Sequence, residues 1–233
     1  MTNLNLEAKE VKQELIDFLL PFSTPERYHK FKEVLQWRSR WLTVVLEDIF
    51  QPHNASAVLR SCDCFGVQDV HIVENKVEFN PNSHVAMGAD QWLTLYRYED
   101  EGTNNMASCY EYLRQQGYSI AATTPHNPNV TIAELPIDRK LALVFGTELR
   151  GLSDWAIENA DYRVAIPMLG FTESFNISVS ASLFLYELTN RLHREREDWR
   201  LSEAEHLDLM IDWLAGSIRA GEQLVAKFMS KHP

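Results

Sequence analysis

One segment of the sequence, residues 52–60, places a carboxamide and a guanidinium where they can serve a ligand site. Asn54 is of a type that begins helices, and Arg60 would then lie inside the second turn. A guanidinium there can bind anionic or hydroxyl groups through several N–H donors at once. A structural role fits these residues equally well, with Asn54 only capping the helix and Arg60 only pairing with a surface carboxylate.

A second segment, residues 146–153, has two glycines five positions apart, Gly146 and Gly151, which permit a close backbone approach to a ligand. Ser153 can cap the helix that follows. The segment is not a P-loop, because no Gly-Lys-Ser/Thr follows, and it lacks the three glycines of the dinucleotide-binding fingerprint. Glu148 is therefore either a structural carboxylate that accepts backbone hydrogen bonds or a catalytic group.

A third segment, residues 167–180, places Ser174 and Asn176 where they can cap a helix while presenting their side chains to a cavity. The serines that follow do not indicate a hydrolase, because the nucleophile motif G-x-S-x-G is absent and no His–Asp partner is evident. The segment is better suited to binding than to nucleophilic attack.

The three segments are separated by short apolar, β-branched runs that predict buried strands. These runs cover residues 42–46, 70–73, 118–122, 141–145 and 162–166. Helical patterns alternate with them near 55–65, 105–115, 153–158 and from 176 onward. The alternation predicts an α/β fold with a mostly parallel sheet covered on both faces. Ligands bind beyond the carboxyl ends of parallel strands, where these three segments should meet.

Helical patterns flank the predicted sheet on both sides. Thr24 and Pro25 begin a helix that runs to about residue 36, and an earlier helical pattern covers residues 4–20. An amphipathic stripe from Ser202 predicts a further helix, which we expect to pack on its own domain or on a sister subunit. We therefore expect an N-terminal helical extension over 1–41, the sheet domain over 42–197 and a C-terminal helical extension over 198–233.

The formal net charge of -11 argues against a general nucleic-acid binder, because phosphate is repelled by a uniformly acidic surface. The charge is uneven, however, and two basic groups stand out. They are Arg27, Lys30, Lys32, Arg38 and Arg40, and then Arg191, Arg194, Arg196 and Arg200. By composition alone, solvated helix faces explain these groups better than RNA contact does.

Composition also bounds the class of protein. A chain of 233 residues with 45% hydrophobic and 24% charged residues is an ordinary globular composition. No apolar run is long enough for a bilayer and the start of the chain resembles no targeting peptide, so we expect a cytoplasmic protein. Three cysteines without paired spacing predict neither a disulfide framework nor a zinc site.

Taken in order, the three segments resemble the three motifs of the SpoU family within the knotted SPOUT superfamily of RNA methyltransferases. The family patterns are N-x-x-A-x-x-R, then F-G-x-E-x-x-G-L, then I-P-M-x-G with S-L-N-V-S. In this chain they stand as Asn54-x-x-Ala57-x-x-Arg60, Phe145-Gly146-x-Glu148-x-x-Gly151-Leu152, and Ile166-Pro167-Met168-x-Gly170 with Ser174-Phe175-Asn176-Ile177-Ser178. Phe175 and Ile177 depart mildly from the pattern. The resemblance covers about residues 42–196.

The resemblance implies a SPOUT fold with a deep C-terminal trefoil knot, a homodimer, and S-adenosylmethionine bound inside the knot. Backbone groups at Thr123, Gly146, Ile166 and Phe175 would form the walls around the cofactor. The full set of cofactor-binding residues that it implies is Thr123, Phe145, Gly146, Gly151, Ile166, Met168, Gly170, Phe175 and Asn176. No metal is implied, since methyl transfer needs no Lewis acid and no ligand cluster is present.

The reaction implied is methylation of a ribose 2′-hydroxyl, which needs its proton drawn off. The family assigns this role to the residue that matches Arg60, with Asn54 and Glu148 shaping the site and Ser174 and Asn176 completing it. An arginine side chain stays protonated in proteins and is not expected to lose its proton. Arg60 could instead orient the hydroxyl beside a phosphate, and His53 is a chemically easier base.

The segment that starts at Pro52 and the basic helix before it resemble the group that methylates guanosine 18 of tRNA. Two alternatives remain: a ribose methyltransferase for ribosomal RNA or another tRNA position, and a catalytically idle knotted protein that binds RNA. The residues that we expect to contact RNA are His53, Arg27, Lys30, Lys32, Arg38, Arg40, Arg191 and Arg194.

Overall fold

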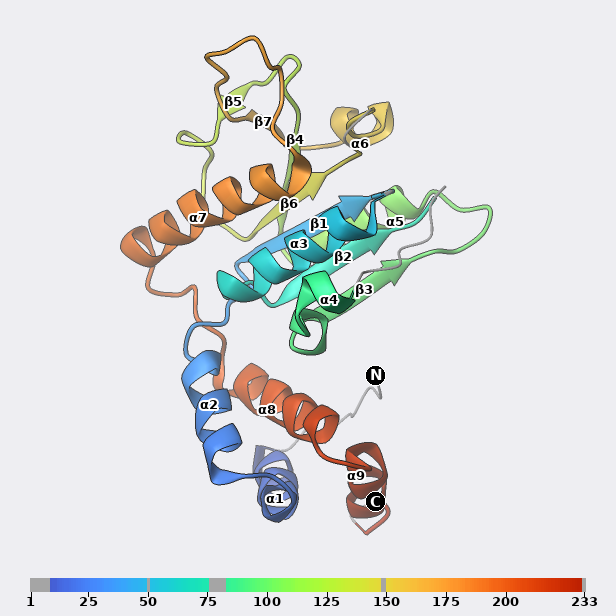
Figure 1. The fold of residues 1–233 in the computed structure, drawn as a ribbon, viewed down its shortest axis with the longest axis vertical. Coiled ribbons are helices and arrows are strands. Elements are labelled where there is room, and N and C mark those ends of the chain that lie inside the picture. The colour runs from blue at the N-terminus through green and yellow to red at the C-terminus, as the bar shows by residue number, and fades with distance from the viewer. Residues whose placement is uncertain (1–8, 50, 76–82, 148–149, 232–233) are drawn as a thin grey trace. The chain divides into compact units, whose positions relative to one another are not determined.

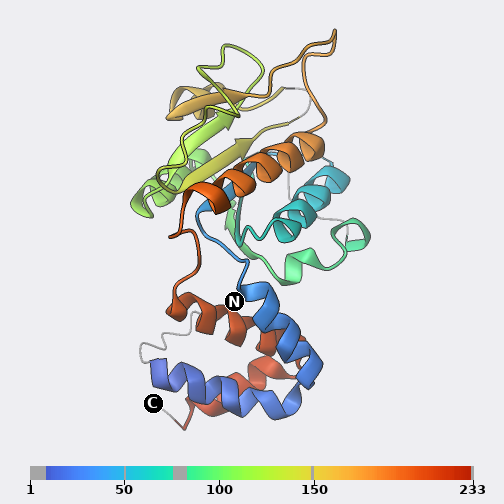
Figure 2. The same cartoon turned by 90° about the vertical axis from the view of Figure 1, so that its left-hand side faces the viewer.

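The computed structural model describes residues 9–49, 51–75, 83–147 and 150–231. The chain forms two compact units. The sheet unit comprises residues 39–199, and the helical unit comprises both ends of the chain, up to Arg38 and from Arg200. The two terminal segments, which the sequence suggested as separate extensions, therefore share one unit, coloured blue and red in Figure 2.

The sheet unit contains seven strands in the order β3-β2-β1-β6-β4-β7-β5, and every neighbouring pair is parallel. The strands are β1 (Leu42–Glu47), β2 (Asp69–Val73), β3 (Thr94–Tyr98), β4 (Ser119–Thr123), β5 (Val130–Thr131), β6 (Leu141–Phe145) and β7 (Tyr162–Ala165). The parallel α/β prediction is confirmed. The pattern analysis found five of these strands and missed β3, whose residues are only half-buried, and β5, which has two residues.

Helices cover both faces of this sheet (Figure 1). They are α3 (Pro52–Cys64), α4 (Ser83–Ala86), α5 (Asn105–Gln115), α6 (Asp154–Glu158) and α7 (Ile177–Glu195), with a 3-10 turn, η2 (Ala89–Gln91). On one face α3 and α7 lie side by side and bury Val58, Leu59, Leu185 and Leu188 against β1 and β6. Each such side chain contributes about 1.5–3 kcal/mol when it leaves water.

The opposite face of the sheet is covered by α5 and α6, where Met106, Tyr110 and Ala156 pack against Val45 and Val144. Val44 and Val45 are adjacent in β1 and belong to the two different clusters, as expected where successive side chains of a strand point to opposite faces. Because the sheet is buried on both faces, its central strands are continuous apolar runs without alternation.

The helical unit is built from α1 (Lys9–Leu19), η1 (Leu20–Phe22), α2 (Pro25–Leu35), α8 (Glu203–Ser217) and α9 (Gly221–Met229). The Thr24 hydroxyl accepts a hydrogen bond from the backbone N–H of Arg27, which confirms the predicted start of α2. Leu15 and Leu19 of α1 are fully buried, and Phe31 of α2 packs edge-on against Trp213 of α8 at 5.5 Å. Of the helices described, none combines the length and apolar character needed to cross a bilayer.

Candidate functional site

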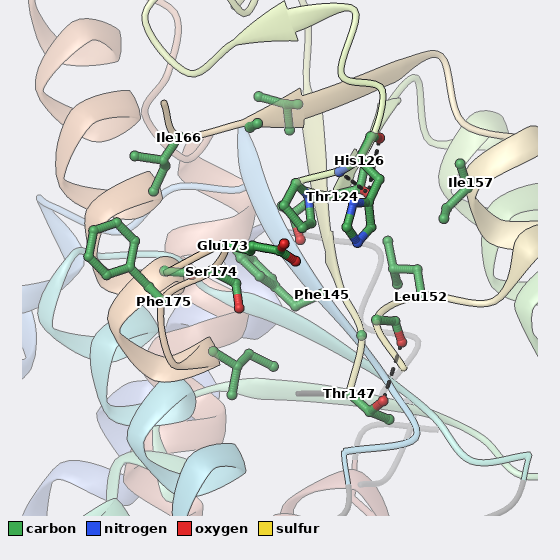
Figure 3. Close-up of a pocket in the computed structure, with 18 of the residues that line it drawn as sticks. Thr124, His126, Phe145, Thr147, Leu152, Ile157, Ile166, Glu173, Ser174 and Phe175 are labelled. Carbon is green, nitrogen blue, oxygen red and sulfur yellow. Dashed lines mark hydrogen bonds between the residues drawn. The ribbon is translucent and has the colours of Figure 1, made fainter. Parts of the chain in front are cut away.

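The loops that follow β4, β6 and β7 line a cavity of about 340 Å³ at the carboxyl edge of the sheet (Figure 3). Parallel pairing brings these three loops together, because the carboxyl ends of parallel strands lie at the same edge. The walls combine polar groups with the apolar side chains of Phe145, Leu152, Ile157 and Val164. Cavities of this size and character are suited to a small organic ligand.

The loop after β6 closes on itself through its two glycines. Thr147 and Gly151 exchange backbone hydrogen bonds of 3.0 and 2.9 Å, and Gly151 has a φ of +66°. A Cβ added to Gly146 would lie 2.3 Å from the carbonyl carbon and oxygen of Gly151. The close backbone approach that the glycines permit is therefore between the two ends of the loop itself, and both glycines line the cavity.

Two side chains secure the helix that leaves this loop. The carboxylate of Glu47, at the end of β1 and 4% exposed, accepts a hydrogen bond of 2.9 Å from the backbone N–H of Ser153. The Ser153 hydroxyl in turn accepts from the backbone N–H of Ala156, which confirms the predicted cap of α6. Glu148, predicted as a structural or catalytic carboxylate, lies outside the described residues.

The first and third motifs meet through two asparagines. Asn176 Nδ2 donates a hydrogen bond of 3.2 Å to Asn54 Oδ1, and Asn54 Nδ2 donates one of 3.0 Å to Gln51 Oε1. Asn176 Oδ1 accepts from the backbone N–H of Ser178 at 2.9 Å, so that Asn176 is the N-cap of α7 as predicted. These bonds fix both carboxamides in one orientation.

The predicted cap at Asn54 is wrong. The helix α3 begins at Pro52, three residues before the start that a cap at Asn54 would give, because proline at the first helical position has no N–H to satisfy and its φ suits a helix. Asn54 therefore lies in the first turn, nearly buried, and Arg60 lies in the third turn instead of the second. Because it does not cap α3, the side chain of Asn54 is available for the hydrogen bond to Asn176 at the start of α7.

Arg60 is exposed on α3 and is not among the residues that line the cavity. It makes no hydrogen bond or ion pair with the part of the chain that the structure describes. His53 is also exposed, and because seven residues make almost two helical turns, it shares a face of α3 with Arg60. The next residue, Ser61, lies 2.9 Å from the hydroxyl of Ser182, which sets α3 against α7.

Most of the residues expected to bind a cofactor line the cavity, but two do not. Lining it are Thr123, Phe145, Gly146, Gly151, Ile166, Met168 and Phe175, together with Ser174 from the catalytic set. Gly170 and Asn176 are not lining residues, although Ser174 and Phe175 next to Asn176 are. The Thr123 hydroxyl donates its hydrogen bond to the carbonyl of Val144, so this hydroxyl has no proton left to donate to a ligand.

Sequence reasoning missed several residues of the same cavity. They include Thr124, His126, Arg150 and Glu173. Two of them directly follow β4, so the rule that ligands bind at the carboxyl ends of parallel strands could have found them. The hydroxyl of Thr124 accepts a hydrogen bond from the backbone N–H of His126, which holds this loop in a tight turn.

The residues expected to contact RNA differ in their exposure. Arg27, Lys30 and Lys32 lie exposed on α2. Arg38 is only 1% exposed, with its guanidinium over the ring of Trp213 at 5.3 Å. RNA contact by Arg38 does not fit this burial, because the side chain is held inside the helical unit.

In the sheet unit, Arg40 forms an ion pair with the buried Asp69 at 3.0 Å. The side chain of Arg191 is 12% exposed and donates to the carbonyl of Ile132. Arg194 and His53 are exposed. The described residues contain no group of three or more His, Cys, Asp or Glu suited to a metal ion, and a metal-free reaction stays a prediction.

Known proteins resemble this chain in sequence and in fold. A family model described as the SpoU rRNA Methylase family matches residues 41–186. The tRNA (guanosine(18)-2'-O)-methyltransferase of Borreliella burgdorferi is 40% identical over 198 residues, which are 85% of this chain and 88% of that protein. The enzyme of the same name from Thermus thermophilus is 32% identical over 197 residues, 82% of this chain and 97% of that protein.

A solved structure shares the fold. The crystal structure of the A. aeolicus TrmH/SpoU tRNA modifying enzyme matches with a TM-score of 0.73 at 26% identity, over 84% of this chain and 97% of that one. The match spans more of this chain than the sheet unit alone contains.

Proposed function

This chain belongs to the SpoU methylase family, and from that membership we propose that it transfers a methyl group from S-adenosylmethionine to the ribose 2′-hydroxyl of guanosine 18 in tRNA. The observation that carries the proposal is the 40% identity, over 85% of the chain, to a relative named for this reaction. A tRNA substrate also implies a cytoplasmic site of action.

The residues around the cavity fit the cofactor. About 340 Å³ of space, with walls that combine apolar side chains and a few charged groups, suits an adenosine joined to an amino acid. Backbone groups of Thr123, Gly146 and Ile166 would hold the adenine, and Phe145 and Leu152 would pack beside it. The bound cofactor supplies a methyl group on a sulfonium, ready for in-line transfer.

The protein's own part in the reaction is to orient the acceptor hydroxyl and to ease the loss of its proton. We assign the first task to Arg60, whose guanidinium can bind a phosphate and a ribose hydroxyl together. His53 lies on the same face of α3, and its imidazole can accept a proton. Asn54 and Asn176 hold the start of α7 in place, and Ser174 lies in the cavity wall beside them.

Because Arg60 does not line the cavity of its own chain, we propose that the active form is a homodimer that brings the two together. An exposed apolar stripe supports this proposal. It consists of Phe175, Val179, Leu183 and Tyr186, which are 42%, 45%, 39% and 60% exposed. Val179, Leu183 and Tyr186 are spaced by four and three and therefore lie along one side of α7, which packs against α3, and Phe175 lies just before the N-cap of that helix.

The double variant Val179→Glu, Leu183→Glu should sediment as a monomer, whereas the unaltered chain should sediment as a dimer. Met87→Glu is the matched control, since Met87 is 70% exposed but lies outside the stripe. A double variant that still sediments as a dimer would refute this interface.

We further propose that the crossings after β6 form the trefoil knot of the family. The sheet order supports this, since β6 lies between β1 and β4, whereas the next strand, β7, lies beyond β4. Stretching the unfolded chain from its two ends in a single-molecule experiment should leave a contour shorter than that of the full 233 residues. A contour of full length would exclude a knot.

The function is tested by incubating unmodified tRNA with the protein and S-adenosylmethionine, and mapping ribose methylation nucleotide by nucleotide. One new 2′-O-methyl group at guanosine 18 is expected. Methylation at another position of tRNA, or of ribosomal RNA, would show that the reaction is correct and the proposed substrate is wrong. No methylation of any RNA would favour an idle RNA-binding protein.

A further inference from the structure

The cavity wall contains three ionisable side chains among the described residues: His126, Arg150 and Glu173. They come from three different loops, which follow β4, β6 and β7. Glu173 carries a negative charge and Arg150 a positive charge, so the wall offers a partner to each sign of charge, and the imidazole of His126 lies in the same wall. None of the three belongs to the set that the sequence motifs suggested.

Glu173 projects its carboxylate from the loop before α7 into the cavity, toward the side where the ring of His126 lies (Figure 3). Its carboxylate makes no ion pair or hydrogen bond with any of the residues that the structure describes. A carboxylate without such a partner, directed into a ligand-sized cavity, is suited to a cationic group of the ligand.

The cofactor has two cationic groups, the sulfonium and the α-ammonium of its methionine part. A carboxylate binds an ammonium more strongly, because the ammonium donates N–H hydrogen bonds and the sulfonium has none to donate. The sulfonium must also face the incoming ribose, beside RNA phosphates that a nearby carboxylate would repel. The ammonium is therefore the better partner for Glu173.

We infer that Glu173 binds the α-ammonium of the methionine part of S-adenosylmethionine, with His126 and Arg150 as the basic counterpart near its α-carboxylate. The inference rests on the proposed function, since it names how that cofactor is held. A wall that contains the carboxylate of Glu173 and the guanidinium of Arg150 matches an amino acid, which carries both charges. Glu173 is thus a cofactor-binding residue and takes no part in proton transfer.

The test is calorimetry of the full chain with three probes: S-adenosylhomocysteine, S-adenosylmethionine and 5′-methylthioadenosine. The first two contain the ammonium and differ in the sulfonium charge, whereas the third has neither the ammonium nor the carboxylate. Glu173→Gln should weaken both amino-acid probes by about tenfold, the usual effect of losing a charge-assisted hydrogen bond at a partly exposed site. It should change the affinity for 5′-methylthioadenosine less than twofold.

Glu173→Asp keeps the charge and should lose less affinity than Glu173→Gln. Glu101→Gln is the matched control, since Glu101 is exposed in a turn outside the cavity, and it should bind all three probes like the unaltered chain. Unchanged melting temperatures establish that each variant folds.

Several outcomes would overturn the inference. Equal weakening of all three probes would make Glu173 a residue that only shapes the cavity, and weakening of S-adenosylmethionine alone would place the carboxylate at the sulfonium. Unchanged binding of S-adenosylhomocysteine by Glu173→Gln would show that Glu173 does not contact the α-ammonium. If instead the unaltered chain binds none of the probes, the proposed function itself fails, which is a different result.

Discussion

The carboxamide of Asn176 donates a hydrogen bond of 3.2 Å to the side-chain oxygen of Asn54, 122 positions earlier in the chain. The bond joins the first turn of α3 to the N-cap of α7, and it connects the first and third sequence motifs directly. A displacement of either helix would therefore also displace the loop that contains Ser174 and Phe175, which line the cavity.

This bond predicts energetic coupling between the two asparagines. Asn176→Ala should lower the free energy of unfolding by about 1–2 kcal/mol, since it removes both the N-cap of α7 and the bond to Asn54. Asn54→Ala should cost less, and the double variant should show a coupling of about 1 kcal/mol in urea unfolding. Asn190→Ala, in the exposed middle of α7, is the control. Strictly additive effects would show that the bond contributes nothing.

Arg60 should be required for methyl transfer and dispensable for cofactor binding. It is exposed and does not line the cavity, so Arg60→Ala should lower the methylation rate by about 10²–10⁴-fold while leaving the affinity for S-adenosylhomocysteine unchanged. A tRNA methylation assay and calorimetry on the same preparation measure the two quantities. Arg139→Ala alters another exposed arginine as a control. A parallel fall in cofactor affinity would contradict the assignment.

The exposed lysines of α2 should contribute to tRNA binding. Reversing the charge of Lys30 and Lys32 with glutamate should weaken binding and flatten its salt dependence by about one to two units of slope, because fewer counterions are released. The control pair is Arg219→Glu with Lys227→Glu, which makes the same change in net charge at exposed positions of the same unit. A salt slope equal to that of the unaltered chain would exclude α2 from the interface.

Gly146 should tolerate no side chain. A Cβ there would lie 2.3 Å from backbone atoms of Gly151, which cannot rotate away, so Gly146→Ala must displace the loop after β6. We expect a loss of about 1–3 kcal/mol of stability and a weaker affinity for S-adenosylhomocysteine. Gly216→Ala, in α8 with open space around its Cβ position, should be neutral or stabilising. A Gly146→Ala variant with unchanged cofactor affinity would show that the loop is not part of the binding wall.

His71 should make stability depend on pH in the acid range. Burial lowers the pKa of His71 to about 4, whereas the unfolded chain has a value near 6.5. Between these values the unfolded chain binds the additional proton, so stability falls as the pH is lowered from 6.5 toward 4, by about 3 kcal/mol at most. His71→Phe keeps an aromatic ring beside Tyr96 and should remove this part of the slope. Identical slopes in urea unfolding would contradict the prediction.

Local pattern in the sequence determined much of this protein. Apolar runs predicted five strands because a strand buried on both faces must be continuously apolar, and strand–helix alternation predicted the parallel sheet. The caps at Ser153 and Asn176 followed from their residue types, since a side-chain oxygen must satisfy a free backbone N–H at the start of a helix. The three motifs could be found for the same reason, because each is a short continuous segment of the chain.

Only the tertiary structure decided which of these side chains meet. Asn54 bonds to Asn176 instead of capping α3, Arg38 is buried under Trp213, and Glu173 enters the cavity that His126 also lines. Each of these relationships joins residues far apart in the chain, and the order of strands in the sheet sets the distances between them. The packing of the whole core fixes that order of strands. The residues that it brings together therefore show no pattern in the sequence that would predict their contact.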